Sequence, residues 1–259
     1  MEKRTVINSQ ITTGSFDEFI ENIFDLVGRK KSSYVCCANV HMLIEAYKDN
    51  AFNKVLNEAD LVTPDGTPLS KVIKWFDKID QERVAGMDLM PTLLEEAERR
   101  GKSVYFYGST VEVLSKIRKK VSKNFPNLNI AGTFSPPFRP LIDSEDQEVV
   151  DDINMANPDI LFVALGCPKQ EKWMAAHKEK LNTCMIGVGQ SFMVFAGVEK
   201  RLPLWARNLS LEWAYRLYQE PRRLWKRYLF TNSMFIFLIL RNLFPKLYNP
   251  FLKKGPSKL

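Results

Sequence analysis

Short runs of β-branched and aromatic residues alternate with longer segments of helical periodicity, and this alternation restricts the fold more than any other feature of the chain. The short runs predict strands at residues 34–38, 60–63, 103–107, 128–132, 159–165 and 184–188. Between them, helices are predicted notably at residues 88–100, 111–124, 146–156 and 168–181. Strands that alternate with helices favour a mainly parallel sheet with helices on its faces. We therefore expect an α/β fold that is Rossmann-like.

Charge is distributed unevenly along the chain. The net charge is +7, yet residues 199–259 hold 13 Lys and Arg against 3 Asp and Glu, so the remainder is slightly acidic. Aromatic residues interleave with these arginines, and Pro221 divides the region into two predicted helices. Such a segment favours a polyanionic partner, either an acidic membrane, a nucleic acid or a phosphate-bearing substrate. We divide the chain into an α/β catalytic domain, residues 1–198, and a basic, aromatic helical appendage, residues 199–259.

The sequence predicts neither export nor a membrane span. The N-terminal segment turns polar before any long apolar run, which argues against a cleaved signal peptide. The most apolar run, residues 234–240, has 7 residues, whereas about 20 are needed to cross a bilayer. Four cysteines without C-x-x-C spacing and two histidines predict neither a disulfide framework nor a metal cluster. We expect a cytoplasmic protein.

The apolar residues 235–240 are followed by cations, which is typical of a segment that lies at the surface of an anionic membrane. The alternative is that these residues pack against the body of the protein or against a second subunit.

Glycine-containing turns follow four of the predicted strands, at Gly66, Gly108, Gly166 and the pair Gly187 and Gly189. The carboxyl ends of parallel strands meet at one edge of a sheet, and ligands bind there. Glycine lets backbone N–H groups approach a ligand, and the helix that follows favours an anion. Each turn alone could be an ordinary connection, but four at one edge favour a phosphate-bearing ligand.

Asp65 stands between Pro64 and Gly66 directly after a predicted strand, and Arg83 follows one predicted helix later. A carboxylate can accept the proton of a hydroxyl group, and a guanidinium can bind a phosphate. Sugar transfer from a nucleotide donor needs both. The chain contains no Asp-x-Asp triplet, the sequence with which many glycosyltransferases hold a divalent metal.

An ordered series of motifs resembles the WecG/TagA/CpsF family of inverting glycosyltransferases, also called glycosyltransferase family 26. After Asn39, the series comprises ADLVTPDG at 59–66, ERVAGMDL at 82–89, GCPKQE at 166–171, GVG at 187–189, AG at 196–197, RLPLW at 201–205, LEWAYRL at 211–217 and EPRR at 220–223. The resemblance extends in consistent order over roughly residues 5 to 230.

The resemblance implies transfer of an N-acetylmannosamine-type sugar from a UDP-sugar to a polyprenyl-diphosphate-linked sugar, in cell-surface polysaccharide or wall teichoic acid synthesis. It implies that Asp65 is the general base and that Arg83 holds a diphosphate. Beside Gly108, Gly166, Gly187 and Gly189, which the turn pattern already assigns to ligand binding, the resemblance implies further substrate-binding residues at Asn39, Lys169, Gln170, Glu171, Arg216, Arg223 and Arg227. The last three arginines would stabilise the leaving diphosphate without a metal or other cofactor. Cys37 stands where related chains often have a hydroxyl residue.

Two other classes of protein share part of this pattern. A nucleic-acid- or nucleotide-binding α/β protein without transferase activity would also carry a basic, aromatic tail, but it would not explain Asp65 and Arg83 at the sheet edge. A dinucleotide oxidoreductase would need a G-x-G-x-x-G after the first strand, which is absent. We therefore expect a transferase without a nucleic-acid partner, peripherally associated with the inner face of the cell membrane. A homo-oligomer is left open.

Overall fold

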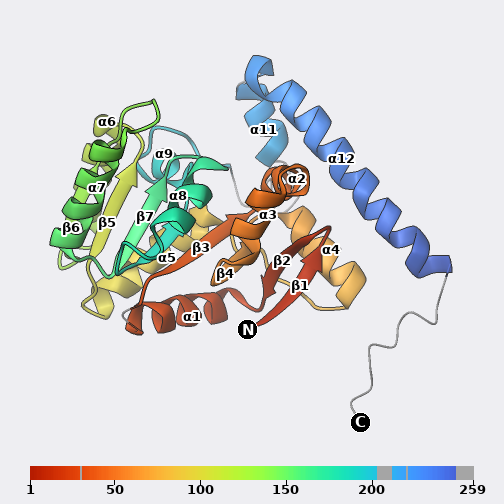
Figure 1. Ribbon diagram of the computed structural model, residues 1–259, viewed down its shortest axis with the longest axis horizontal. Helices are drawn as coiled ribbons and strands as arrows, with labels where there is room; N and C mark the ends of the chain where they lie inside the picture. The colour runs from red at the N-terminus through yellow and green to blue at the C-terminus, as the bar shows by residue number, and fades with distance from the viewer. Residues whose placement is uncertain (30, 203–211, 220, 249–259) are drawn as a thin grey trace, which may run out of the picture.

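The structure is a computed structural model that describes residues 1–29, 31–202, 212–219 and 221–248, with only part of the side chains in the last two segments. Within these residues, a parallel sheet has the strand order β4-β3-β8-β7-β5-β6 (Figure 1). Its strands are β3 (Ser33–Ala38), β4 (Leu61–Pro64), β5 (Val104–Gly108), β6 (Ile130–Phe134), β7 (Ile160–Ala164) and β8 (Cys184–Gly187). The predicted α/β fold is confirmed.

Helices cover both faces of this sheet (Figure 1). One face packs against α1 (Phe16–Gly28), α5 (Gly86–Arg99), α6 (Val111–Asn124) and α9 (Ser191–Phe195). The other packs against α2 (Val40–Lys48), α3 (Asn50–Asn57), α4 (Thr67–Asp77), α7 (Asp143–Ala156) and α8 (Lys169–His177). Neighbouring strand residues point to opposite cores, as Val35 and Cys36 do in β3. Because both faces are buried, the strands are nearly continuous apolar runs, which is why the sequence reveals them.

Each predicted strand is present, and its ends differ from the prediction by at most 2 residues. The helix predicted at 168–181 is shorter, and the prediction of its end was wrong. Helix α8 ends at His177, where the N–H groups of Lys180 and Leu181 both donate to the His177 carbonyl, at 2.9 and 3.0 Å. This tight turn directs Leu181 into the core, where it is buried. Tertiary packing therefore ends the helix before its periodic pattern does.

A hairpin of two strands, β1 (Glu2–Val6) and β2 (Ser9–Thr13), was not predicted from the sequence. Its tight turn contains Ile7 with φ of 63°, a conformation for which glycine and asparagine are the usual signals. The hydroxyl of Thr12 accepts a hydrogen bond of 3.0 Å from the N–H of Val62 in β4. The hairpin thus lies against the outer strand of the large sheet and covers an edge that would otherwise be open.

Two helices follow at the C-terminal end, α11 (Glu212–Gln219) and α12 (Pro221–Tyr248). Helix α12 packs along α2 (Figure 1). In its apolar segment Phe235, Leu238 and Ile239 are buried in the core, whereas the side chains of Ile236, Phe237 and Leu240 are exposed. One side of the segment therefore packs on the body, as the alternative interpretation expected, and the other side faces solvent. Its contact with a membrane stays a prediction. No helix in the described residues is both long and apolar enough to span a membrane.

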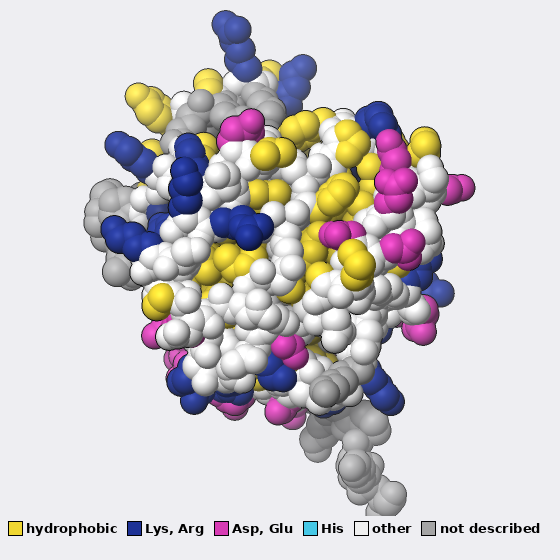
Figure 2. Space-filling model, turned by 90° about the vertical axis from the view of Figure 1, so that its left-hand side faces the viewer, with side chains coloured by type: hydrophobic (Ala, Val, Ile, Leu, Met, Phe, Trp, Pro, Cys, Tyr) yellow, Lys and Arg dark blue, Asp and Glu magenta, His cyan; other side chains and the backbone are white. Residues whose placement is uncertain are grey.

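The surface near the β6 edge carries charges of both signs. Figure 2 shows this face, with hydrophobic side chains in its middle, mostly Lys and Arg toward one side and mostly Asp and Glu toward the other.

The division of the chain at residues 198 and 199 into two domains stays a prediction.

Candidate functional site

Asp65 lies directly after β4, at the carboxyl edge of the sheet. Its backbone N–H donates to the carbonyl of Ala38 at the end of β3, at 2.8 Å. Its half-buried carboxylate accepts from the N–H of Gly86, the first residue of α5, at 3.4 Å. No side chain caps this helix from the residue before it, so the carboxylate lies at a helix start, where negative charge is favoured.

Gly86, at the start of α5, lies close to the ends of β3, β4 and β8. A Cβ atom at this position would lie 3.1 Å from the hydroxyl of Ser191, 3.5 Å from the sulfur of Cys37 and 3.5 Å from the carbonyl of Val188. Burial raises the pKa of the Cys37 thiol, and the Asp65 carboxylate nearby raises it further. Cys37 is therefore a neutral thiol beside the predicted base.

Arg83 lies beside the same strand end, because the N–H of the next residue, Val84, donates to the carbonyl of Pro64 at 3.0 Å. The Nη2 atom of Arg83 contacts one carboxylate oxygen of Asp88 at 2.9 Å. The Nη2 atom of Arg201 contacts the other at 2.5 Å. Asp88 and Arg201 were not among the predicted site residues. Asp88 could have been suspected from its place five residues after Arg83, whereas Arg201 is brought here by tertiary structure.

On the neighbouring strands, Gln170 connects the ends of β7 and β8. Its Oε1 accepts from the N–H of Gly166 at 3.3 Å, and its Nε2 donates to Glu171 at 2.7 Å. A Cβ atom at Gly187 would lie 3.0 Å from Nε2, and one at Gly189 would lie 3.4 Å from Oε1. These predicted residues therefore form one cluster. Gly187 needs its small size because Met174 and Gln170 both pack directly against it.

Burial differs sharply among the first three residues of α8. Lys169 is exposed, whereas Gln170 is 4% exposed and Glu171 is 0% exposed. Burial raises the pKa of Glu171 to about 7, against hydrogen bonds that favour the charged form. A ligand at the surface can reach Lys169 directly. Glu171 can act on it only through neighbouring residues such as Gln170 and Cys167, which are hydrogen-bonded to its carboxyl group.

Other predicted site residues have structural contacts of their own. The Asn39 side chain caps α2 by accepting from the N–H of Met42 at 3.2 Å. Gly108 has φ of 117°, and a Cβ atom there would lie 2.4 Å from the carbonyl oxygen of Ala164, so packing between β5 and β7 requires glycine. The predicted binding roles of both stay predictions. The side chains of Arg216, Arg223 and Arg227 lie outside the described residues.

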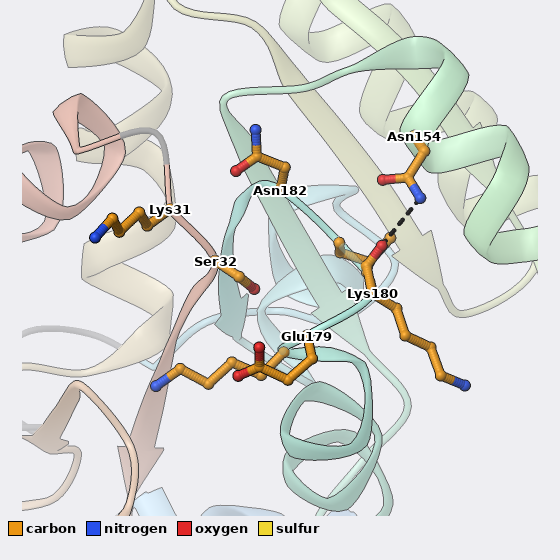
Figure 3. Close-up of a pocket in the computed structure, with 8 residues that line it drawn as sticks. Lys31, Ser32, Asn154, Glu179, Lys180 and Asn182 are labelled. Atoms are coloured by element: carbon orange, nitrogen blue, oxygen red, sulfur yellow. Dashed lines mark hydrogen bonds between the residues drawn. The ribbon is translucent and has the colours of Figure 1, made fainter.

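A pocket of about 410 Å³ lies at the opposite end of the sheet (Figure 3). Ser32, just before β3, and Asn182, just before β8, line it. Asn154 donates a hydrogen bond of 3.0 Å to the carbonyl of Lys180 at its rim. Figure 3 shows the side chains of Lys31 and Lys180 pointing away from each other. This pocket at the amino ends of the strands is therefore separate from the predicted ligand edge.

A parallel sheet with a carboxylate and paired arginines at the carboxyl ends of its strands defines an α/β enzyme suited to a phosphate-bearing substrate. The family model of the glycosyl transferase WecG/TagA/CpsF family matches residues 4–248, and the chain therefore belongs to this family. The protein is a glycosyltransferase, and the alternative of a binding protein without transferase activity is set aside.

Characterised relatives are similar over most of their length. Two are N-acetylglucosaminyldiphosphoundecaprenol N-acetyl-beta-D-mannosaminyltransferases of Bacillus spizizenii and Bacillus subtilis, each 34% identical to this chain. The matches cover 86% of this chain and 83% and 84% of those proteins. A protein of the same name from Staphylococcus aureus strain MW2 is 31% identical, with 85% of each chain covered.

Proposed function

We propose that the protein transfers N-acetylmannosamine, or a related sugar, from a UDP-sugar to a polyprenyl-diphosphate-linked sugar during wall teichoic acid or other cell-surface polysaccharide synthesis. The names of the relatives support the transferred sugar and the lipid-diphosphate-linked acceptor, whereas the UDP-sugar donor rests on the resemblance of the motifs. The observation that carries the chemistry is the position of Asp65 and Arg83 beside one strand end.

In this scheme the Asp65 carboxylate accepts the proton of the acceptor hydroxyl. The hydroxyl oxygen forms a bond to the anomeric carbon of the donor, while the bond between that carbon and the nucleotide diphosphate breaks on the opposite face. The sugar is transferred with inversion. Arg83 stabilises the negative charge that develops on the departing diphosphate.

Residues near the ends of β7 and β8, together with Asn39 and the arginines of the appendage, supply the remaining contacts. Lys169 meets a phosphate or sugar hydroxyl, and the Gln170 amide holds the turns at Gly166 and Gly189 in place around it. Asn39 positions the sugar from the end of β3. Arg216, Arg223 and Arg227 of the appendage add positive charge near the diphosphate, so the reaction proceeds without a metal or other cofactor.

The lipid anchor of such an acceptor requires the enzyme to work at a membrane, and α12 offers a surface for this contact. Its exposed residues recur every three or four positions along one side of the helix. The apolar members of this outer stripe are Trp225, Leu229, Phe230, Ile236, Phe237 and Leu240, and the cationic members are Arg222, Lys226 and Arg241. Apolar side chains with cations beside them suit the headgroup region of an anionic bilayer. We place the enzyme at the inner face of the cell membrane.

A donor screen with purified protein tests the proposed function. UDP-N-acetylmannosamine, UDP-N-acetylglucosamine and UDP-glucose are each incubated with a synthetic lipid-diphosphate N-acetylglucosamine, and products are identified by mass spectrometry. We expect a lipid-linked disaccharide from the N-acetylmannosamine donor. Transfer from another donor alone would change the assigned sugar, and no transfer from any of the donors would contradict the proposed reaction.

A further inference from the structure

We propose that Arg201 is a second diphosphate-binding cation of the active site, and that Asp88 positions it together with Arg83. This inference rests on the proposed function, because it assigns a partner to the diphosphate that the reaction releases. It also adds a residue at the beginning of the appendage, ahead of its helices, to the charged part of the site.

The arrangement of charges supports this role. One carboxylate, Asp88, contacts two guanidinium groups, one through each oxygen. The two guanidinium groups are therefore held side by side by one carboxylate. The side chains of Arg83, Asp88 and Arg201 are 18%, 31% and 26% exposed, so they are partly desolvated yet reachable. A cation in such surroundings attracts an anionic ligand more strongly than one in open water does.

Arg201 itself is incompletely paired. Its Nε atom is buried and has no hydrogen-bond partner among the described residues. A guanidinium presents its N–H donors in a planar fork that matches two oxygens of a phosphate. A diphosphate oxygen that reached Nε would satisfy a donor for which the described residues provide no acceptor.

The backbone before Arg201 directs it to this place. After α9 the chain folds back, since the N–H groups of Val198 and Glu199 both donate to the carbonyl of Met193, at 3.0 and 3.2 Å. The Gln190 side chain also donates to the carboxylate of Glu199. Helix α9 begins at Ser191, which packs against Gly86 beside Asp65. The segment that ends in Arg201 is therefore fastened next to the predicted base.

An anchoring role is the competing explanation, because the contact with Asp88 could merely hold the chain that leads to α11. The two roles respond differently to the loss of Asp88. If Arg201 is an anchor, Asp88→Asn, which removes the ion pairs of Asp88 with both Arg201 and Arg83, has an effect at least as large as that of Arg201→Gln. If Arg201 binds the diphosphate, Asp88→Asn keeps that cation and an amide oxygen that can still accept its hydrogen bond, and it also removes an anion that competes with the ligand, so it costs less than Arg201→Gln.

Binding of inorganic pyrophosphate, measured by isothermal titration calorimetry on the full chain, separates these roles. We expect Arg201→Gln to weaken binding about tenfold or more, Arg201→Lys to recover part of the loss, and Asp88→Asn to stay within about threefold of the wild type. Lys200→Gln is the matched control, because it removes the same charge from an exposed neighbour. We expect it to bind as the wild type does.

Equal affinities for wild type and Arg201→Gln, or equal losses in Arg201→Gln and Asp88→Asn, would overturn the assignment. The donor screen is run on the same wild-type preparation. Failure of transfer there would contradict the proposed function, whereas active wild type with an unchanged Arg201→Gln affinity would contradict only the role of Arg201.

Discussion

Asp65 and Glu171 are two carboxyl groups at the same edge of the sheet with different surroundings. Asp65 is half-buried at the start of α5, where an acceptor hydroxyl can approach it. Glu171 is completely buried and bonded to Gln170, so it cannot touch a substrate in this structure. The difference in burial therefore suits these two carboxyl groups to different roles. Asp65 suits proton transfer, and Glu171 suits the positioning of a neighbouring amide.

Asp65→Asn is expected to lower turnover about 100-fold or more, because the amide keeps the shape of the side chain and loses the proton acceptor. Binding of the nucleotide donor should stay nearly unchanged. Steady-state kinetics with the donor and acceptor identified by the screen measure the first effect, and calorimetry with the donor measures the second. Turnover within threefold of the wild type would exclude Asp65 as the general base.

Glu171→Gln is expected to change how stability depends on pH. The pKa of Glu171 rises from its ordinary 4.5 to about 7 on folding, so between these values the folded state holds a proton that the unfolded state has lost. Wild-type stability is therefore favoured at low pH and falls as pH rises through 7. Relative to Glu171→Gln, the loss should amount to about 2 to 3 kcal/mol.

Urea unfolding at pH 4.5, 6 and 7.5 measures this difference in the free energy of unfolding. The exposed Glu179, just after the same helix, provides the control substitution Glu179→Gln. Curves for wild type and Glu171→Gln that run parallel across this range would show that Glu171 has no raised pKa.

At the scale of single elements, α12 has two sides with different tasks. Thr231, Phe235, Leu238 and Ile239 recur at helical spacing and are buried toward the body of the protein. The outer stripe is apolar as well, which is unusual for a helix surface and marks a site of interaction. A helix of this kind can stay docked on α2 while its other side meets a membrane.

Replacement of Ile236, Phe237 and Leu240 by serine together is expected to reduce partitioning onto vesicles that contain phosphatidylglycerol by at least about tenfold, because three apolar contacts are lost. Cosedimentation measures the bound fraction. Met155→Ser on α7 is the control, since Met155 is 84% exposed and lies on another helix. Equal binding of wild type and triple variant would refute the membrane role. A dimer that dissociates in the variant would identify the stripe as a subunit interface.

At the scale of the whole molecule, the site is assembled from segments far apart in sequence. Asp65 follows β4, Gln170 lies at the start of α8 after β7, and Arg201 follows α9. Parallel strands make this possible, because all their carboxyl ends meet at one edge. The positive charges at this edge include the guanidinium groups of Arg83 and Arg201. Guanidinium groups are suited to stabilising a diphosphate.

Activity is expected to survive incubation with EDTA, because in the proposed scheme arginines balance the charge of the leaving diphosphate. Within the described residues, no three His, Cys, Asp or Glu side chains are grouped so that they could hold a metal ion. Transfer rates are compared before and after chelation, followed by addition of magnesium or manganese. Complete loss that either ion restores would contradict a metal-free reaction.

The local features of this protein could be predicted from its sequence. Apolar strands buried on both faces, helices with regular periodicity and the turns that hold Asp65, Gly108 and Gly166 all leave a signal within a few residues. The resemblance of ordered motifs identified Arg83 and Gln170. Since these patterns are repeated along the chain, the α/β fold followed from them, and so did the position of Asp65 at the carboxyl edge of the sheet.

Tertiary structure decided which residues meet and which are buried. The contact of Arg201 with Asp88 joins positions 113 residues apart. A local sequence pattern spans only a few turns of a helix or a single strand, so it cannot predict this contact. The burial of Glu171, the end of α8 at His177 and the two sides of α12 likewise depend on neighbours from other segments. The physical reason is that secondary structure follows from local periodicity, whereas burial and charge pairing depend on packing between elements that only the folded chain brings together.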